Sequence, residues 1–162
     1  MLFRSTHRRY VEHAVFSDES LVLREHERMA PVDIIENKDW KNGMGSSHKA
    51  GLAGLLVKSD QIDAVIVLVC DQPNLSEGHL RILIARAADT HAQCVASSYA
   101  GTVGVPSLFK RATFELIMAI DNESGAKKII RDLGTAVTVV NFPGGETDLD
   151  TPGDYEAFMA GK

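Results

Sequence analysis

The sequence lacks the features that would indicate a zinc, redox or membrane protein. It has 162 residues but only two cysteines, Cys70 and Cys94, which are too far apart to form a C-x-x-C pair. No run of ~18 apolar residues occurs that could cross a bilayer, and residues 1–10 have no apolar core of signal-peptide length. We therefore expect a soluble protein without a membrane partner, in a reducing, cytoplasmic setting.

An excess of positive charge is lacking as well. The 17 lysines and arginines are outnumbered by 22 acidic residues, which gives a formal net charge of −5, and no long basic run occurs. Because nucleic-acid-binding proteins generally present a basic surface to the phosphates, we expect no nucleic-acid partner. The six histidines are scattered, without the short spacing of zinc ligands, and His48 is the one that borders a glycine-rich segment.

Apolar runs and helical patterns alternate along the chain. The run Ala64–Val69 is wholly apolar and mostly β-branched, which is typical of a strand covered by helices on both faces. We expect one α/β domain over residues 1–162, with three α/β/α layers around a mostly parallel sheet. Strands are expected at 10–16, 32–36, 64–69, 94–97, 137–140 and in a short segment ending at Asp150, and helices at 17–29, after Ser46 or Ser47, after Ser76, near 114–118, near 126–133 and after Thr151.

Asp71 follows the Ala64–Val69 run within the segment Cys70-Asp71-Gln72-Pro73. It would therefore lie at the carboxyl edge of the sheet, where α/β proteins bind ligands. A carboxylate there can hold a divalent cation against phosphate groups. The alternative is that Asp71 only caps the next turn, since Asp and Pro are common turn residues.

Two other loops add candidate functional residues. Gly43-Met44-Gly45-Ser46-Ser47 offers backbone amides and hydroxyls before a helix, although glycine and serine there are equally typical of a plain helix cap. Asp148-Leu149-Asp150 carries two acids, and Asp150 could meet Asp71 across the sheet edge. Two neighbouring carboxylates are costly without a cation between them, so this pairing predicts Mg²⁺ better than either acid does alone.

Two further segments are weaker candidates. The residues from Gly101 to Ser107 are too glycine-rich for a strand interior and too apolar for a surface turn, so we expect a loop that lines a pocket. Lys127 and Lys128 lie at an expected helix start, where they either attract an anion or form a solvated pair.

These motifs together resemble the MobA-like NTP transferases, and among them the branch of molybdenum cofactor cytidylyltransferases. The matching segments are Asn37 with Gly43–Ser47 and Gly51-Leu52 (base side), Cys70–Pro73 (metal aspartate), Gly104-Val105-Pro106 with Leu108-Phe109 (a Gly-x-Pro-x-Leu-Phe loop), Gly125-Ala126-Lys127 (a helix start) and Asp148–Pro152 (closing motif).

The resemblance implies a Rossmann-like nucleotidyltransferase fold and transfer of CMP from CTP to a molybdopterin-type cofactor, with release of pyrophosphate. Asp71 and Asp150 would be catalytic and hold Mg²⁺. The implied nucleotide-binding residues are Asn37, Gly43, Gly45 and Ser46, and the implied substrate-binding residues are Gly104, Pro106, Gly125 and Lys127. Only the resemblance favours CTP over GTP.

The sequence departs from the family at its beginning. The family opens with a strand and a glycine-rich Leu-Ala-Ala-Gly loop, with an arginine and a lysine that grip the triphosphate, and nothing before Asn37 matches them. The missing strand would lie inside the sheet, beside the one leading to Asp71. We therefore expect either that Tyr10–Phe16 moves into the gap or that an exposed sheet edge pairs with a partner, such as a second copy.

This departure leaves three alternatives for function. The chain is an active Mg²⁺-dependent cytidylyltransferase, or a truncated or degenerate homologue that binds a nucleotide or a protein without turnover. A sugar-nucleotide pyrophosphorylase would share the architecture and the metal-binding acids but act on a sugar phosphate.

Overall fold

The structure is a computed structural model, and it describes residues 2–5, 12–16 and 33–161. The strands are β1 (Leu2–Ser5), β2 (Glu12–Phe16), β3 (Asp33–Glu36), β4 (Ala64–Leu68), β5 (Cys94–Tyr99), β6 (Thr102–Lys110) and β7 (Val137–Asn141). The helices are α2 (Met44–Lys58), α3 (Glu77–Asp89), α4 (Phe114–Ala119), α5 (Ala126–Leu133) and α6 (Pro152–Ala160), with short 3-10 turns at Trp40–Asn42, Arg111–Thr113 and Gly134–Ala136. The helix expected at 17–29 lies outside the described residues.

The strands form one sheet in the order β3-β2-β1-β4-β6-β5-β7. Strands β2, β3, β4, β5 and β7 run in one direction, because β2 pairs with β3 and β5 with β7 in parallel, and β1 and β6 run opposite to their neighbours. The expected α/β fold is therefore confirmed, and its sheet is mixed. Five strands share one direction, but the two reversed strands, which the sequence pattern did not reveal, make four of the six neighbouring pairs antiparallel.

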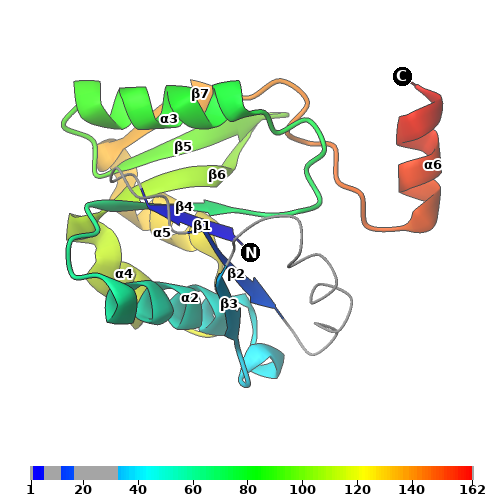
Figure 1. Ribbon diagram of the computed structural model, residues 1–162. Coiled ribbons are helices and arrows are strands. Elements are labelled where there is room, and N and C mark those ends of the chain that lie inside the picture. Colours follow the sequence, from blue (N-terminus) through cyan, green and yellow to red (C-terminus); the bar gives the residue numbers. More distant parts are fainter. Residues whose placement is uncertain (1, 6–11, 17–32, 162) are drawn as a thin grey trace.

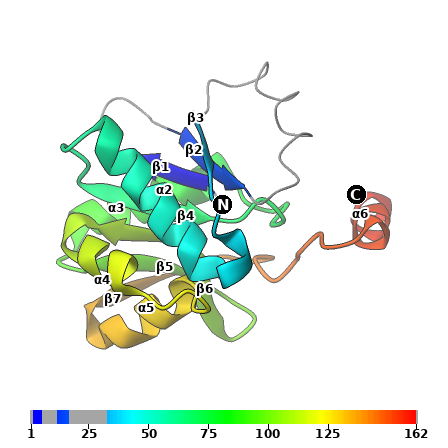
Figure 2. The ribbon, with the colours of Figure 1, turned by 90° about the horizontal axis from the view of Figure 1, so that it is seen from below.

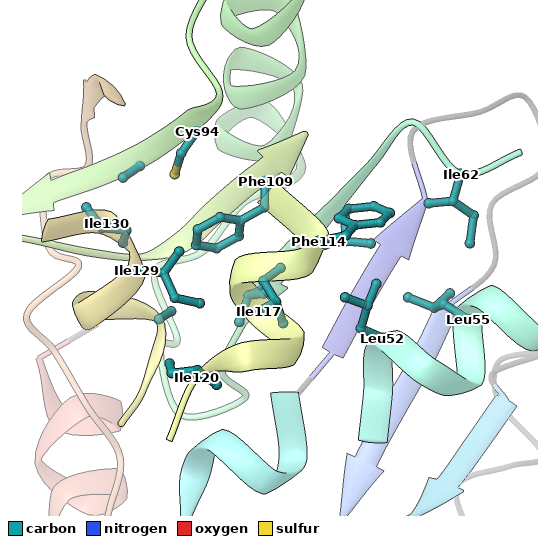
Figure 3. Close-up of a cluster of buried hydrophobic side chains, with 14 residues drawn as sticks. Leu52, Leu55, Ile62, Cys94, Phe109, Phe114, Ile117, Ile120, Ile129 and Ile130 are labelled. Atoms are coloured by element: carbon teal, nitrogen blue, oxygen red, sulfur yellow. The ribbon is translucent and has the colours of Figure 1, made fainter. Parts of the chain in front are cut away.

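Helices cover both faces of the sheet, as the wholly apolar β4 indicated (Figures 1 and 2). Val65 and Val67 face α2, α4 and α5, whereas Ala64, Ile66 and Leu68 face α3. Phe109 of β6 is fully buried in the larger cluster, together with Ile117 and Ile129 from the covering helices (Figure 3). This two-sided core fixes where β4 ends and so where Asp71 lies.

The expected gap beside β4 is filled within the chain. Leu2–Ser5 forms β1, which pairs with β4 on one side and with β2 on the other, antiparallel to both. The segment that occupies the gap is therefore Leu2–Ser5. The strand that was expected to come first forms β2, which lies on the other side of β1 from β4. With β1 in place, the edges of the described sheet are β3 and β7.

The prediction of a loop between Gly101 and Ser107 was wrong, because residues 102–107 belong to strand β6 and only Gly101 lies in a turn. The expectation that this segment lines a pocket is met by Val105. Ala100 and Gly101, at φ 45° and 75°, form a two-residue hairpin turn between Tyr99 and Thr102, the geometry that suits a tight β-hairpin. The pairing register then shifts between Ala96 and Ser97, a β-bulge opposite Val105 and Pro106. A bulge accommodates a proline, which has no N–H to donate to the ladder.

Two other expected boundaries differ. Helix α2 begins at Met44 with Gly43 as its N-cap, so Gly45, Ser46 and Ser47 lie inside its first turn. The short strand expected to end at Asp150 is not formed.

The predicted start of α6 is correct. Thr151 and Asp154 form a reciprocal capping box, and Pro152 is the first helical residue. Helix α6 lies apart from the sheet in both views (Figures 1 and 2). Among the described residues, no helix is long and apolar enough to cross a membrane.

Candidate active site

A pocket of about 340 Å³ lies at the carboxyl end of β4. We call it the Asp71 pocket, and it is lined by Met44, His48, Val67, Val69, Asp71, Gln72, Tyr99, Val105, Gly125, Ala126, Lys127 and Asp148. Its wall is largely apolar, with acidic and basic groups from three different segments. This combination and size are typical of small-molecule sites in proteins.

Hydrogen bonds hold the closing segment against the end of β4. The Leu149 amide donates to the Asp71 carbonyl at 2.9 Å. The buried Gln72 side chain donates through Nε2 to the Gly145 carbonyl at 2.7 Å. The Asp71 loop and the Asp148–Asp150 segment therefore meet through the Leu149 backbone bond and through the charges of Asp71 and Asp150 on Asp148. The direct meeting of Asp150 with Asp71 stays a prediction.

The carboxylates of this region repel one another. Burial raises the pKa of Asp148, and the negative charges of Asp71 and Asp150 raise it further, against the opposing effect of Lys127. Asp71 is half-buried, and its Oδ1 atom is buried without a hydrogen-bond partner among the described residues. A divalent cation with oxygen ligands would satisfy this atom and relieve the repulsion, so these residues fit Mg²⁺.

A magnesium site needs only a few protein carboxylates, because substrate phosphates and water supply the other ligands. In the described part of the chain, no group of three or more histidine, cysteine or acidic side chains is arranged to hold a metal. Asp71 and Asp148 line the pocket, whereas Asp150 is exposed and does not line it. Asp150 nevertheless lies close enough to raise the pKa of Asp148.

Of the four expected substrate-binding residues, two line the Asp71 pocket and two do not. Gly125 and Lys127 line the pocket at the start of α5, while Lys128 pairs with Asp132 at 2.5 Å instead. Gly104 and Pro106 are buried in β6 and do not line it.

Gly104 contributes by leaving space for two residues that do line the pocket. A Cβ atom at Gly104 would lie 2.9 Å from the Tyr99 hydroxyl and 3.4 Å from Cε of Lys127. An added Cβ would therefore force the Tyr99 side chain to shift, while it would only touch Lys127.

Asn37 and Ser46 lie in a separate pocket, of about 440 Å³, which also includes Lys49 and Asn122. The Asn37 side chain donates to the hydroxyls of Ser46 at 2.8 Å and Ser47 at 2.9 Å. Lys49 donates to the Ile120 carbonyl at 3.1 Å and also to the Asn122 side chain. These polar groups hold the start of α2 in place, so the sequence candidates belong to two pockets, not one.

The glycines before and within α2 contact protein, which corrects the expectation of free amides open to a ligand. The Gly45 amide donates to the Asn122 carbonyl at 2.8 Å, and the Ser46 amide to the Gly43 carbonyl at 3.1 Å. A Cβ atom would lie 2.4 Å from the Asn122 carbonyl oxygen at Gly43 and 2.2 Å from that of Asp121 at Gly45. Both glycines therefore allow close packing of α2 against the 121–124 loop.

Sequence reasoning missed Tyr99 and underrated Asp148. Burial raises the pKa of the Tyr99 hydroxyl, and the nearby charges of Asp148 and Asp71 raise it as well. The hairpin turn that brings Tyr99 to the pocket is signalled only by Gly101. Asp148 was visible in the motif, but the resemblance assigned the metal-binding role to Asp150.

Asp148→Asn should test the repulsion among the acids. A carboxyl whose pKa is raised on folding destabilises the folded state at pH values above its unfolded pKa, and the effect disappears once both states are protonated. We therefore expect the variant to unfold at an equal or slightly higher temperature at pH 7 and to lose this advantage at acid pH. The gain should be small because Asp148 is exposed. A clearly lower melting temperature at pH 7 would contradict it.

The fold and the acid-edged pocket define a nucleotidyltransferase-like α/β protein. Residues 5–137 match the family model of the MobA-like NTP transferase domain, so the chain belongs to that family. It is 30% identical over 122 residues to the purine catabolism protein PucB of Bacillus subtilis. The aligned part makes up 74% of this chain and 57% of PucB, so the chain spans less than two thirds of that relative.

Solved structures share the fold at low sequence identity. Rv0371c from Mycobacterium tuberculosis H37Rv, in complex with manganese, superposes with a TM-score of 0.72 at 18% identity, over 93% of this chain and 77% of its own. The molybdopterin-guanine dinucleotide biosynthesis protein A from Archaeoglobus fulgidus gives a TM-score of 0.62 at 12% identity, over 93% and 79%. These similarities support the nucleotidyltransferase fold.

Proposed function

We propose that the chain binds CTP with Mg²⁺ at the Asp71 pocket and acts in the transfer of CMP to a molybdopterin-type cofactor. In this reaction a phosphate oxygen of the cofactor attacks the α-phosphorus of CTP, and the bond to the departing pyrophosphate breaks. The observation that carries the proposal is the Oδ1 atom of Asp71, which is buried and has no hydrogen-bond partner in the part of the chain that the structure describes. The nearby Asp148 is a second carboxylate, and its pKa is raised.

The residues have distinct parts in this proposal. Asp71 and the Asp148–Asp150 segment hold Mg²⁺, which would neutralise phosphate charge and orient the reacting groups. Lys127, exposed at the pocket mouth, attracts the phosphates as a mobile positive charge. Asn37 and Ser46 support the start of α2 and through it the position of Met44 and His48. Positioning and charge neutralisation supply most of the catalysis in reactions of this type.

The named relatives bear on separate parts of the proposal. The manganese complex of Rv0371c supports a divalent metal in a protein with the same fold. The name of PucB refers to purine catabolism and that of the Archaeoglobus protein to a guanine dinucleotide. The choice of cytosine as the base and of a molybdopterin-type acceptor therefore rests on the resemblance of the sequence motifs alone. We also propose a cytoplasmic location and pairing of two copies through edge strand β3 or β7.

Calorimetric titration of the folded chain with CTP, with and without Mg²⁺ and with GTP in parallel, tests the proposal. Saturable binding of CTP that requires Mg²⁺ would support it. A clear preference for GTP would show that the bound base is guanine and not cytosine. A release assay for pyrophosphate, with a molybdopterin-type or a sugar phosphate acceptor, then separates the cytidylyltransferase from a sugar-nucleotide pyrophosphorylase.

The alternative is a homologue that binds a protein partner without turnover. Absence of binding for both nucleotides by the folded protein would contradict the proposal and favour this alternative.

A further inference from the structure

His48 is a buried polar side chain for which the motifs provide no role. It lies on α2, is 1% exposed, and lines the Asp71 pocket. Its Nε2 atom is buried without a hydrogen-bond partner among the described residues. Two unpartnered acceptors, this nitrogen and Oδ1 of Asp71, thus belong to residues that line one pocket.

The hydrogen bond at the other ring nitrogen fixes the tautomer. Nδ1 of His48 lies 2.8 Å from the Met44 carbonyl oxygen, one helical turn earlier. A carbonyl oxygen can only accept, so Nδ1 carries the hydrogen and donates it. Burial lowers the pKa of the imidazole, although the Met44 hydrogen bond opposes this, and His48 is neutral near pH 7. Nε2 therefore presents a lone pair and can only accept.

We infer that His48 is a specificity residue whose Nε2 accepts a hydrogen bond from an N–H or O–H group on the nucleoside half of the bound nucleotide. This inference rests on the function proposed above. An ionised phosphate offers only acceptor oxygens, which would face the Nε2 lone pair unfavourably, so the triphosphate is placed toward the metal-binding acids and Lys127. Cytidine has three groups of the required chemistry: the 4-amino group and the 2′- and 3′-hydroxyls. The apolar walls from Val67, Val69 and Val105 suit the uncharged half of the ligand.

Two substitutions separate the accepting nitrogen from the rest of the ring. In His48→Asn the side-chain amide can still donate to the Met44 carbonyl but does not reach the position of Nε2. In His48→Gln the longer side chain can place its carbonyl oxygen near that position. His91→Asn, at an exposed site, is the matched control. Thermal unfolding of all four proteins first establishes that they are folded.

The experiment measures dissociation constants for CTP, UTP, 2′-deoxy-CTP and 3′-deoxy-CTP in the presence of Mg²⁺. We expect His48→Asn to bind CTP about tenfold more weakly, as for one lost hydrogen bond in a dry site, and His48→Gln to remain within about threefold of the wild type. The analogue that lacks the bonded group should bind the wild type and His48→Asn equally well, and so identify that group.

Three outcomes would overturn the inference. In the first, His48→Asn binds CTP as the wild type does, and in the second it binds all four nucleotides more weakly by the same factor. In both cases Nε2 does not accept a hydrogen bond from the nucleoside, while the proposed nucleotide binding stands. If the folded wild type binds none of the four, the proposed function fails and this inference fails with it.

Discussion

Asp71→Asn should remove the Mg²⁺-dependent part of CTP binding while leaving the fold intact. Asparagine has the same shape but no charge, so it is a much weaker ligand for a hard cation. We expect the dissociation constant for CTP with Mg²⁺ to rise by about a hundredfold, the order of effect found when one well-placed electrostatic contact is lost from an active site. Calorimetry with and without Mg²⁺ measures this change directly.

The stability of this variant distinguishes a functional acid from a turn-capping one. Within residues 2–5, 12–16 and 33–161, no hydrogen bond to Asp71 Oδ1 is lost on substitution. One of the two charges that raise the pKa of Asp148 is removed as well. The melting temperature should therefore stay the same or rise. A marked fall would favour the turn-capping alternative. Asp60→Asn, in an exposed loop, serves as the control and should change neither property. Unchanged Mg²⁺-dependent binding in Asp71→Asn would contradict the metal-binding role.

Features encoded by a few neighbouring residues could be predicted from the sequence. The apolar Ala64–Leu68 strand followed by Asp71 is one of them, because burial on both faces selects an unbroken apolar run. The starts of α3 and α6 are others. Ser76 accepts a hydrogen bond from the His79 amide, and Thr151 forms a capping box, so each signal lies within one helical turn.

Features that depend on distant residues could not be predicted. Glycine in residues 101–107 looked like a loop signal, but β6 is held by pairing with both β4 and β5, and Gly104 is needed beside Tyr99 and Lys127. The partition of the candidates into two pockets likewise depends on the 121–124 loop, which begins 77 positions after the start of α2 (121 − 44 = 77). Periodicity and composition carry no information about such contacts.

The choice between Asp148 and Asp150 shows the same limit. The sequence predicted a short strand ending at Asp150, but the segment is not a strand and is held by the bond from the Leu149 amide to the Asp71 carbonyl. That contact brings Asp148 to the pocket lining and leaves Asp150 outside it. The charges of Asp71 and Asp150 still raise the pKa of Asp148, because this effect requires only that the acids lie close together.

Gly45→Ala should strongly destabilise the protein, although alanine favours a helix. An interior helical glycine normally costs roughly 0.5–1 kcal/mol relative to alanine. Here the added Cβ would lie 2.2 Å from the Asp121 carbonyl oxygen and 2.9 Å from that of Ser124, both backbone atoms. We expect overpacking to outweigh the propensity gain, with a loss of about 1–3 kcal/mol. For a chain of this size that lowers the melting temperature by roughly 2–4 °C per kcal/mol.

Gly78→Ala is the matched control for this prediction. Gly78 is also helical, but its Cβ would meet only the Ser76 hydroxyl oxygen, at 3.6 Å, so the propensity gain should appear as a small rise in melting temperature. If Gly45 served only to let a nucleotide approach, Gly45→Ala would instead be as stable as Gly78→Ala and would lose binding alone. Opposite shifts in the two variants would show that the shape of the α2 start is set by packing against the 121–124 loop. The pocket then depends on that contact, because α2 carries Met44 and His48 into its wall.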